Sequence, residues 1–135
     1  MLAATVPIRT DDVDSHGHVG SAAFFTYLEE LFAAGLDQIL GEDWVTVRVE
    51  LDFRHELLYA DREARVEAWL ERTGTSSVSF SVAVRRLDGG VVADGRVVLV
   101  AWDPRLRRAR ALAPGEIEAL RAAASPAVDS GRAGV

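Results

Sequence analysis

Hydrophobic and polar positions change their period once along this chain, from a helical spacing to a strand alternation. Between residues 21 and 40 apolar side chains recur every three or four positions, which predicts one long helix. The positions that carry this spacing are Phe24, Leu28, Leu31, Phe32, Gly35, Leu36 and Ile39. Ser21 or a neighbour is the expected N-cap, and Gly41 is the expected C-terminal stop.

After residue 44 the pattern has a period of two, which is typical of strands with one apolar face. The predicted strands are 45–54, 64–71, 78–85 and 91–102. Turn signals separate the later strands at Thr73-Gly74-Thr75-Ser76 and at Asp88-Gly89-Gly90. A single antiparallel sheet of this kind can wrap the long helix with its apolar face.

Shorter segments complete the predicted organisation. Residues 3–9 are interpreted as a first strand, 105–112 as a short extra strand, and 114–124 as a small terminal helix. The length of 135 residues favours one domain, which we place at 1–124. The small and polar tail 125–135 is predicted to be disordered.

Composition narrows the possible functions. Apolar residues make up 49% of the chain, which predicts a folded core, and the net charge of −6 argues against electrostatic capture of nucleic acid. Without cysteine, the chain has no disulfides, thiolate nucleophiles or cysteine-ligated metals. No segment approaches about 18 uninterrupted apolar residues and the first residues lack a basic region, so we expect a cytoplasmic protein without signal peptide or membrane contact.

Candidate chemistry gathers in the loop 10–20, just before the predicted helix. Three acids and two imidazoles lie there, namely Asp11, Asp12, Asp14, His16 and His18. A helix N-terminus offers unpaired amide donors and a partial positive charge. A carboxylate beside such donors is the arrangement that acyl chemistry on a carbonyl needs.

The segment Asp12-Val13-Asp14-Ser15-His16-Gly17-His18-Val19 is similar to an Asp-x-Asp-x-x-Gly-His-Val signature. With Tyr59-Ala60-Asp61 and Asp94-Gly95-Arg96 further on, the chain resembles acyl-CoA thioesterases of the 4-hydroxybenzoyl-CoA thioesterase type. The family's Asn-Asn pair is Gly20-Ser21 here, its first tyrosine is Phe24, and its Arg-Pro-x-Arg segment is His55-Glu56-Leu57-Leu58. The last departure weakens any expectation that coenzyme A phosphates bind at that segment.

The resemblance implies an α+β hotdog fold, in which a single antiparallel sheet of about five strands wraps one long helix. It implies hydrolysis of an acyl or aroyl thioester to free acid and coenzyme A, with Asp14 as nucleophile or general base and no cofactor. It further assigns the backbone amide of Ser21 to the thioester carbonyl oxygen. The remaining candidate residues are His18 for catalysis, and Phe24, Tyr27, Gly17 and Val19 for substrate binding.

The same resemblance implies a homodimer or homotetramer, in which the strand 45–54 pairs with its twin in a second copy. The expected partner is an acyl-CoA or another thioester, and the sequence does not identify the acyl group.

Several alternatives stay open at this point. Asp14 is also interpretable as a turn aspartate that binds nearby amides, and His18 either lines the site or ties the loop down. A non-catalytic module that binds acyl or aromatic ligands would share the fold. A metal site would use His16, His18, Asp12, Asp14 and His55. A basic cluster of Arg105, Arg107, Arg108 and Arg110 either meets phosphates or, as the simpler interpretation, is a solvated surface.

Overall fold

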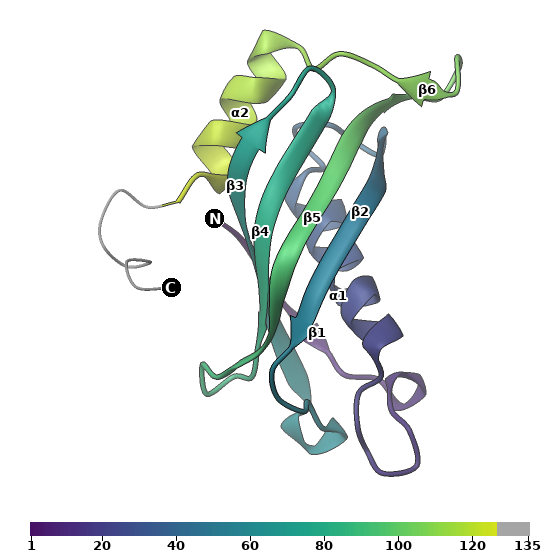
Figure 1. Ribbon diagram of the computed structural model, residues 1–135, viewed down its shortest axis with the longest axis vertical. Coiled ribbons are helices and arrows are strands. Elements are labelled where there is room, and N and C mark those ends of the chain that lie inside the picture. The colour runs from purple at the N-terminus through teal and green to yellow at the C-terminus, as the bar shows by residue number, and fades with distance from the viewer. Residues whose placement is uncertain (127–135) are drawn as a thin grey trace.

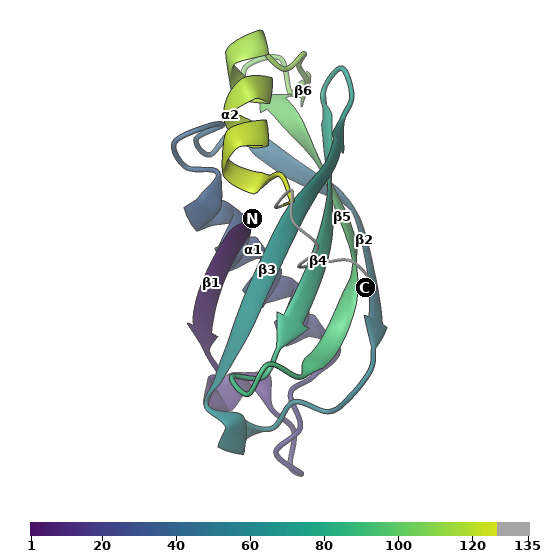
Figure 2. The same cartoon turned by 90° about the vertical axis from the view of Figure 1, so that its left-hand side faces the viewer.

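A curved antiparallel sheet encloses one long helix in the computed structural model, which describes residues 1–126 (Figures 1 and 2). The strand order in the sheet is β1-β3-β4-β5-β2, and the short β6 pairs with β5. All of these pairs are antiparallel. The predicted hotdog fold is therefore confirmed.

The strands follow the alternation of apolar and polar residues closely. Their bounds are β1 (Leu2–Pro7), β2 (Trp44–Phe53), β3 (Glu63–Thr73), β4 (Ser77–Arg85), β5 (Val91–Asp103) and β6 (Arg108–Ala109). β6 is shorter than the predicted segment 105–112, because a turn occupies the residues before it. The nearly continuous apolar run of β5 is explained by its position between β4 and β2.

Helix α1 (Ser21–Gly35) lies across the concave face of the sheet and buries its apolar stripe there. The predicted end at residue 40 is wrong, since residues 36–42 form turns. Leu36 and Leu40 nevertheless return to the core, with 0% and 5% of their surface exposed. These two residues extend the helical spacing of apolar positions beyond the helix itself. The N-cap is Gly20, the neighbour of Ser21, and no side chain caps the helix.

The terminal helix α2 (Pro114–Ala124) has the predicted bounds. It packs near β3, where Leu120 and Ala124 are fully buried (Figure 2). Arg110 anchors its first turn through two hydrogen bonds of 2.8 Å to the carboxylate of Glu116. Of the predicted tail, only residues 125 and 126 are described, and the rest of that prediction lies outside the described residues.

One edge of the sheet carries apolar side chains that the described chain leaves partly exposed. β2 ends the strand order, and Val47, Val49 and Phe53 on it are 57%, 37% and 49% exposed. Phe25 on α1 is 41% exposed and lines, with Val49 and Leu51, a hollow of about 690 Å³ beside this edge. An unpaired strand edge is a ready template for pairing with another chain. None of the helices in residues 1–126 is long and apolar enough to cross a membrane.

Candidate active site

The loop before α1 is a closed turn held by its own backbone. The Asp14 amide donates to the carbonyl of His18 at 3.0 Å, and the Gly17 amide donates to the carbonyl of Asp14 at 3.0 Å. Val13 and Val19 form an isolated antiparallel bridge at the base of the loop. Gly17 has a φ of 78°, a left-handed conformation that glycine adopts without steric cost. The sequence thus folds locally into a rigid frame around Asp14.

The carboxylate of Asp14 is fixed by one of its two oxygens. Oδ1 accepts hydrogen bonds from the amides of His16 at 2.9 Å and His18 at 3.0 Å. The hydrogen bond from the His18 amide is the largest influence on the group, and it lowers the pKa of Asp14 below its ordinary value, with burial opposing. Within residues 1–126, Oδ2 has no hydrogen-bond partner. Asp14 therefore keeps one ionised oxygen available for chemistry.

The start of α1 lies next to this loop. The amides of Ser21 and Ala22 find no acceptor among residues 1–126, as expected for the first turn of a helix. A hollow of about 430 Å³ is lined by Asp14 together with Gly20, Ala22 and Ala23. A carboxylate and the positive end of a helix thus share one open cavity. This arrangement suits a carbonyl group that must be attacked and polarised at once.

A second network of hydrogen bonds and an ion pair links the loop to helix α1. The hydroxyl of Tyr27 donates to Oδ2 of Asp12 at 2.7 Å, and the Arg9 amide donates to the same oxygen at 2.9 Å. The Arg9 guanidinium also pairs with Glu30 at 2.7 Å. Burial, followed by the hydrogen bond to Asp12, raises the pKa of Tyr27. Asp12 therefore orders the loop together with Arg9.

We expect Tyr27→Phe to lower the free energy of unfolding by about 1.5 kcal/mol, because it removes a hydrogen bond to an ionised carboxylate. Catalytic turnover should fall as well, since the loop that holds Asp14 loses its link to α1. Urea denaturation and initial rates would measure both effects. Tyr59→Phe is the matched control, because Tyr59 is 46% exposed and its hydroxyl has no partner among the described residues. Equal effects of the two variants would contradict the anchoring role of Tyr27.

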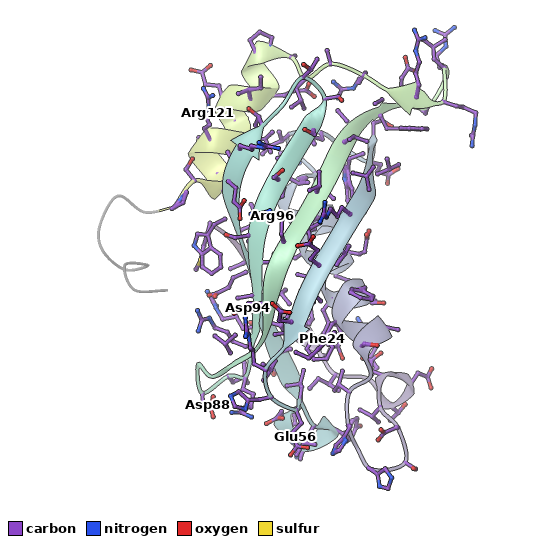
Figure 3. All side chains as sticks on the ribbon, in the orientation of Figure 1. Phe24, Glu56, Asp88, Asp94, Arg96 and Arg121 are labelled. Carbon is purple, nitrogen blue, oxygen red and sulfur yellow. The ribbon has the colours of Figure 1, made fainter. Side chains whose placement is uncertain are left out.

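The segment after β2 supports the loop from its other side. The Val19 amide donates to Leu57 at 2.8 Å, and the Tyr59 amide donates to Gly17 at 2.9 Å. His18 forms a bridge with Leu58, and its Nε2 lies 2.9 Å from a carboxylate oxygen of Glu56. Figure 3 shows Glu56 at this same end of the molecule. These contacts favour the second of the two roles considered for His18, in which it ties the loop down, and a role in catalysis stays a prediction.

The structure places the other candidate residues in two groups. Val19, Phe24 and Tyr27 are buried in the core, with 9%, 2% and 0% of their surface exposed. The ring of Phe24 meets that of Phe53 edge to face at 5.1 Å (Figure 3 labels Phe24). Gly17 shapes the loop, as described above. Contact of these four residues with substrate remains a prediction.

No three histidine, aspartate or glutamate residues within 1–126 are grouped so that they could hold a metal ion. The geometry therefore gives no support to the alternative of a metal site built from the loop and His55.

Sequence reasoning missed the supporting role of residues 56–59. Residues 56–58 are noted only as a departure from the family pattern, and Tyr59 only as part of the matching Tyr59-Ala60-Asp61. The available signal was the polar and apolar order of Glu56-Leu57-Leu58, which resembles a short strand next to a turn.

A curved antiparallel sheet around one long helix defines the class of hotdog proteins, and in this chain a carboxylate lies beside the N-terminus of that helix. Comparisons with known proteins then identify the family. The family model described as Thioesterase superfamily matches residues 16–93. Long-chain acyl-CoA thioesterase FadM of Escherichia coli (strain K12) is 24% identical over 119 residues, which cover 82% of this chain and 90% of that protein.

Solved structures agree with this result. A thioesterase from Thermus thermophilus, in complex with coenzyme A and Zn, is 27% identical with a TM-score of 0.79, covering 89% of this chain and 91% of that one. A predicted thioesterase from Bacillus stearothermophilus has a TM-score of 0.82 at 20% identity, covering 93% and 98% of the two chains. The chain belongs to the thioesterase superfamily, and it is a thioester hydrolase.

Proposed function

We propose that the protein hydrolyses acyl-CoA thioesters to free acid and coenzyme A, with Asp14 as its reacting carboxylate. The observation that carries this proposal is the shared hollow, in which Asp14 lies beside the first turn of α1. The similarity to FadM, which is named as a long-chain acyl-CoA thioesterase, supports the substrate class. The coenzyme A complex of the Thermus thermophilus relative supports it further.

In the proposed reaction the thioester carbonyl enters the hollow and its oxygen accepts a hydrogen bond from the Ser21 amide. Such a donor is worth about 2.7–4 kcal/mol of barrier when it is aimed at the developing oxyanion. Oδ2 of Asp14 then attacks the carbonyl carbon, the C–S bond breaks, and coenzyme A leaves as the thiolate. Water cleaves the resulting mixed anhydride and restores the carboxylate. In the alternative route Asp14 removes a proton from water, which attacks the thioester directly.

The nucleophilic and the general-base routes can be distinguished by the molecule in which the oxygen atom of the attacking water is found after one turnover. A single turnover in heavy-oxygen water should leave label in the carboxylate of Asp14 if that carboxylate attacks and water then cleaves the anhydride at the Asp14 carbon. Mass spectrometry of the peptide that contains Asp14 measures the label. Label found only in the released acid would fit a general base, or water attack at the acyl carbon of the anhydride, and would exclude the route through the Asp14 carbon.

We also propose that two copies pair through β2 and complete the site. Support comes from the free edge of β2 and from its exposed apolar residues Val47, Val49 and Phe53. Pairing two such edges would continue the sheet and cover this surface. The acyl group would then lie between α1, near Phe25, and the second copy.

The experiment that tests the function is the release of free coenzyme A from a panel of substrates. The panel contains acyl-CoAs of graded length, benzoyl-CoA and phenylacetyl-CoA, and release is followed with a thiol reagent. At least one substrate should turn over many times per protein molecule. Stoichiometric binding without turnover would instead identify the non-catalytic binding module.

A further inference from the structure

A hollow of about 240 Å³ lies on the face of the sheet that is turned away from α1. Four strands supply its lining residues, which are Arg48, Glu71, Arg72, Ser79, Arg96 and Val98. Within residues 1–126, none of these six also lines the hollow at Asp14. Three of the six are arginines, on a chain whose net charge is −6. We call this hollow the convex-face hollow.

The strand alternation places these side chains on the convex face. Val97 and Leu99 on β5 face α1, with 2% and 0% of their surface exposed. Arg96 and Val98 therefore face the opposite side of the sheet, because neighbouring residues in a strand alternate between its faces. On β4 the two sequence neighbours of Ser79 are fully buried against the helix, so Ser79 faces the convex side as well. Figure 3 labels Arg96 near the middle of β5.

Two β-bulges set arginines at the two ends of one row of paired residues. Arg72 is paired with Ser79, Ser79 with Val98, and Val98 with Arg48. The register shifts immediately before Arg72 on β3 and immediately before Arg48 on β2. A bulge redirects the side chains next to it. The row crosses three strand spacings, about 14 Å, which two arginine side chains can reach across from opposite ends.

Ser79 forms the floor of the hollow. Only 6% of its surface is exposed, and its hydroxyl has no hydrogen-bond partner among the described residues. No fully buried side-chain oxygen or nitrogen within residues 1–126 lacks a partner, so the Ser79 hydroxyl must still open into the hollow. A polar group in so confined a place is stabilised by a hydrogen bond to whatever fills the hollow.

The arginines keep most of their donors free. One nitrogen of Arg96 lies 3.1 Å from Glu71, and one nitrogen of Arg48 pairs with Glu50. Arg72 is exposed and has neither an ion pair nor a side-chain hydrogen bond in the part of the chain that the structure describes. Each guanidinium carries five N–H groups, so two ion pairs occupy few of them. An excess of one positive charge remains after both pairs are counted.

We propose that the convex-face hollow binds a phosphate group. The Ser79 hydroxyl donates to it from the floor, and Arg48, Arg72 and Arg96 donate from three sides. Donors that converge from several directions suit a tetrahedral oxyanion better than a planar carboxylate, and the guanidinium fork can donate two hydrogen bonds to one phosphate. Glu71 in the lining repels an anion and keeps the binding weak. This inference stands independently of the proposed function.

The first test is calorimetric titration of the protein with inorganic phosphate at constant ionic strength. We expect a Kd of about 1 mM for the wild-type protein. Arg72→Gln should raise this Kd about tenfold, and Ser79→Ala about threefold, because a charged donor contributes more than a hydroxyl. Arg121→Gln is the matched control and should leave the Kd unchanged. It removes an exposed arginine without an ion pair among residues 1–126, and Figure 3 shows that this residue lies on α2.

The second test changes the affinity in the opposite direction. Glu71→Gln removes the negative charge from the lining and releases Arg96 from its ion pair. Phosphate should therefore bind about threefold more tightly than to the wild-type protein. Damage to the sheet would weaken binding, so a gain in affinity separates an electrostatic effect from a structural one. An unchanged or raised Kd in Glu71→Gln would contradict the proposed site.

A third titration asks whether this hollow is part of the substrate site. Glu71 and Arg96 also line the hollow beside β2, so the two hollows adjoin. With coenzyme A present at saturation, the Kd for inorganic phosphate should stay the same. Loss of phosphate binding under that condition would assign the hollow to the phosphates of the substrate and overturn a site of its own.

The remaining outcomes are equally decisive. Absence of saturable phosphate binding by the wild-type protein would overturn the inference. An unchanged Kd in Arg72→Gln would do the same, and an equal rise in Arg121→Gln would show that phosphate only screens surface charge. None of these titrations depends on hydrolysis. A protein that binds phosphate as expected but hydrolyses no thioester would therefore overturn the proposed function alone.

Discussion

Asp14→Asn is expected to lower kcat for thioester hydrolysis by about 10³-fold while the protein stays folded. The amide of asparagine can neither attack the thioester nor take a proton from water. Its Oδ1 can still accept the two hydrogen bonds that the amides of His16 and His18 donate to Asp14. The loop should therefore keep its shape, and the loss should be chemical. Steady-state rates and thermal unfolding of the same preparation would measure the two properties.

Asp11→Asn is the matched control, since Asp11 lines the same hollow and has no hydrogen bond through its side chain in the described part of the chain. It removes one negative charge from the hollow without touching the reacting carboxylate. A similar loss of rate in both variants would mean that the charge of the loop, and not Asp14 itself, governs hydrolysis. Near-normal turnover by Asp14→Asn would remove Asp14 from the mechanism.

The pH dependence of kcat provides a second test of the role of Asp14. Hydrogen bonds from the loop amides stabilise the ionised form of Asp14, so its folded pKa lies below its ordinary value. The carboxylate should thus stay ionised as the pH falls to about 5. We expect no loss of kcat from protonation of Asp14 in that range. A drop in kcat centred near neutral pH would point to a different titrating group, such as a histidine.

The sequence predicts the fold well where one periodicity dominates. The alternation of β2 to β5 and the stripe on α1 reflect burial on a single face, which is a local property. The end of α1 could not be predicted from the periodicity. Leu36 and Leu40 continue the helical spacing of apolar residues, but they lie in turns and pack into the core from there. Their burial depends on the way the chain returns to β2, and that is a tertiary property.

Part of the candidate site could likewise be predicted from the sequence, and part of it could not. Asp14, Asp12 and the first turn of α1 are neighbours in sequence, so their juxtaposition can be predicted from the loop and the helix start. The hydrogen bond from Tyr27 to Asp12 spans fifteen residues along the chain, and the pair of His18 with Glu56 crosses from the loop to the segment after β2. These contacts fix the loop, and only the folded chain brings them together.

Val49→Glu is expected to separate the proposed dimer and to abolish most of the activity at low protein concentration. Val49 lies near the middle of β2, where two antiparallel copies of the strand would place equivalent residues close to each other. Two buried carboxylates at that position repel each other and lose hydration, so the dissociation constant should rise about a hundredfold or more. Light scattering and activity measured over a dilution series would show whether the two properties fall together. Leu87→Glu is the control, since it adds the same charge to a 58% exposed leucine outside the β2 edge. A Val49→Glu protein that has monomer mass and full activity would show that one copy suffices for catalysis.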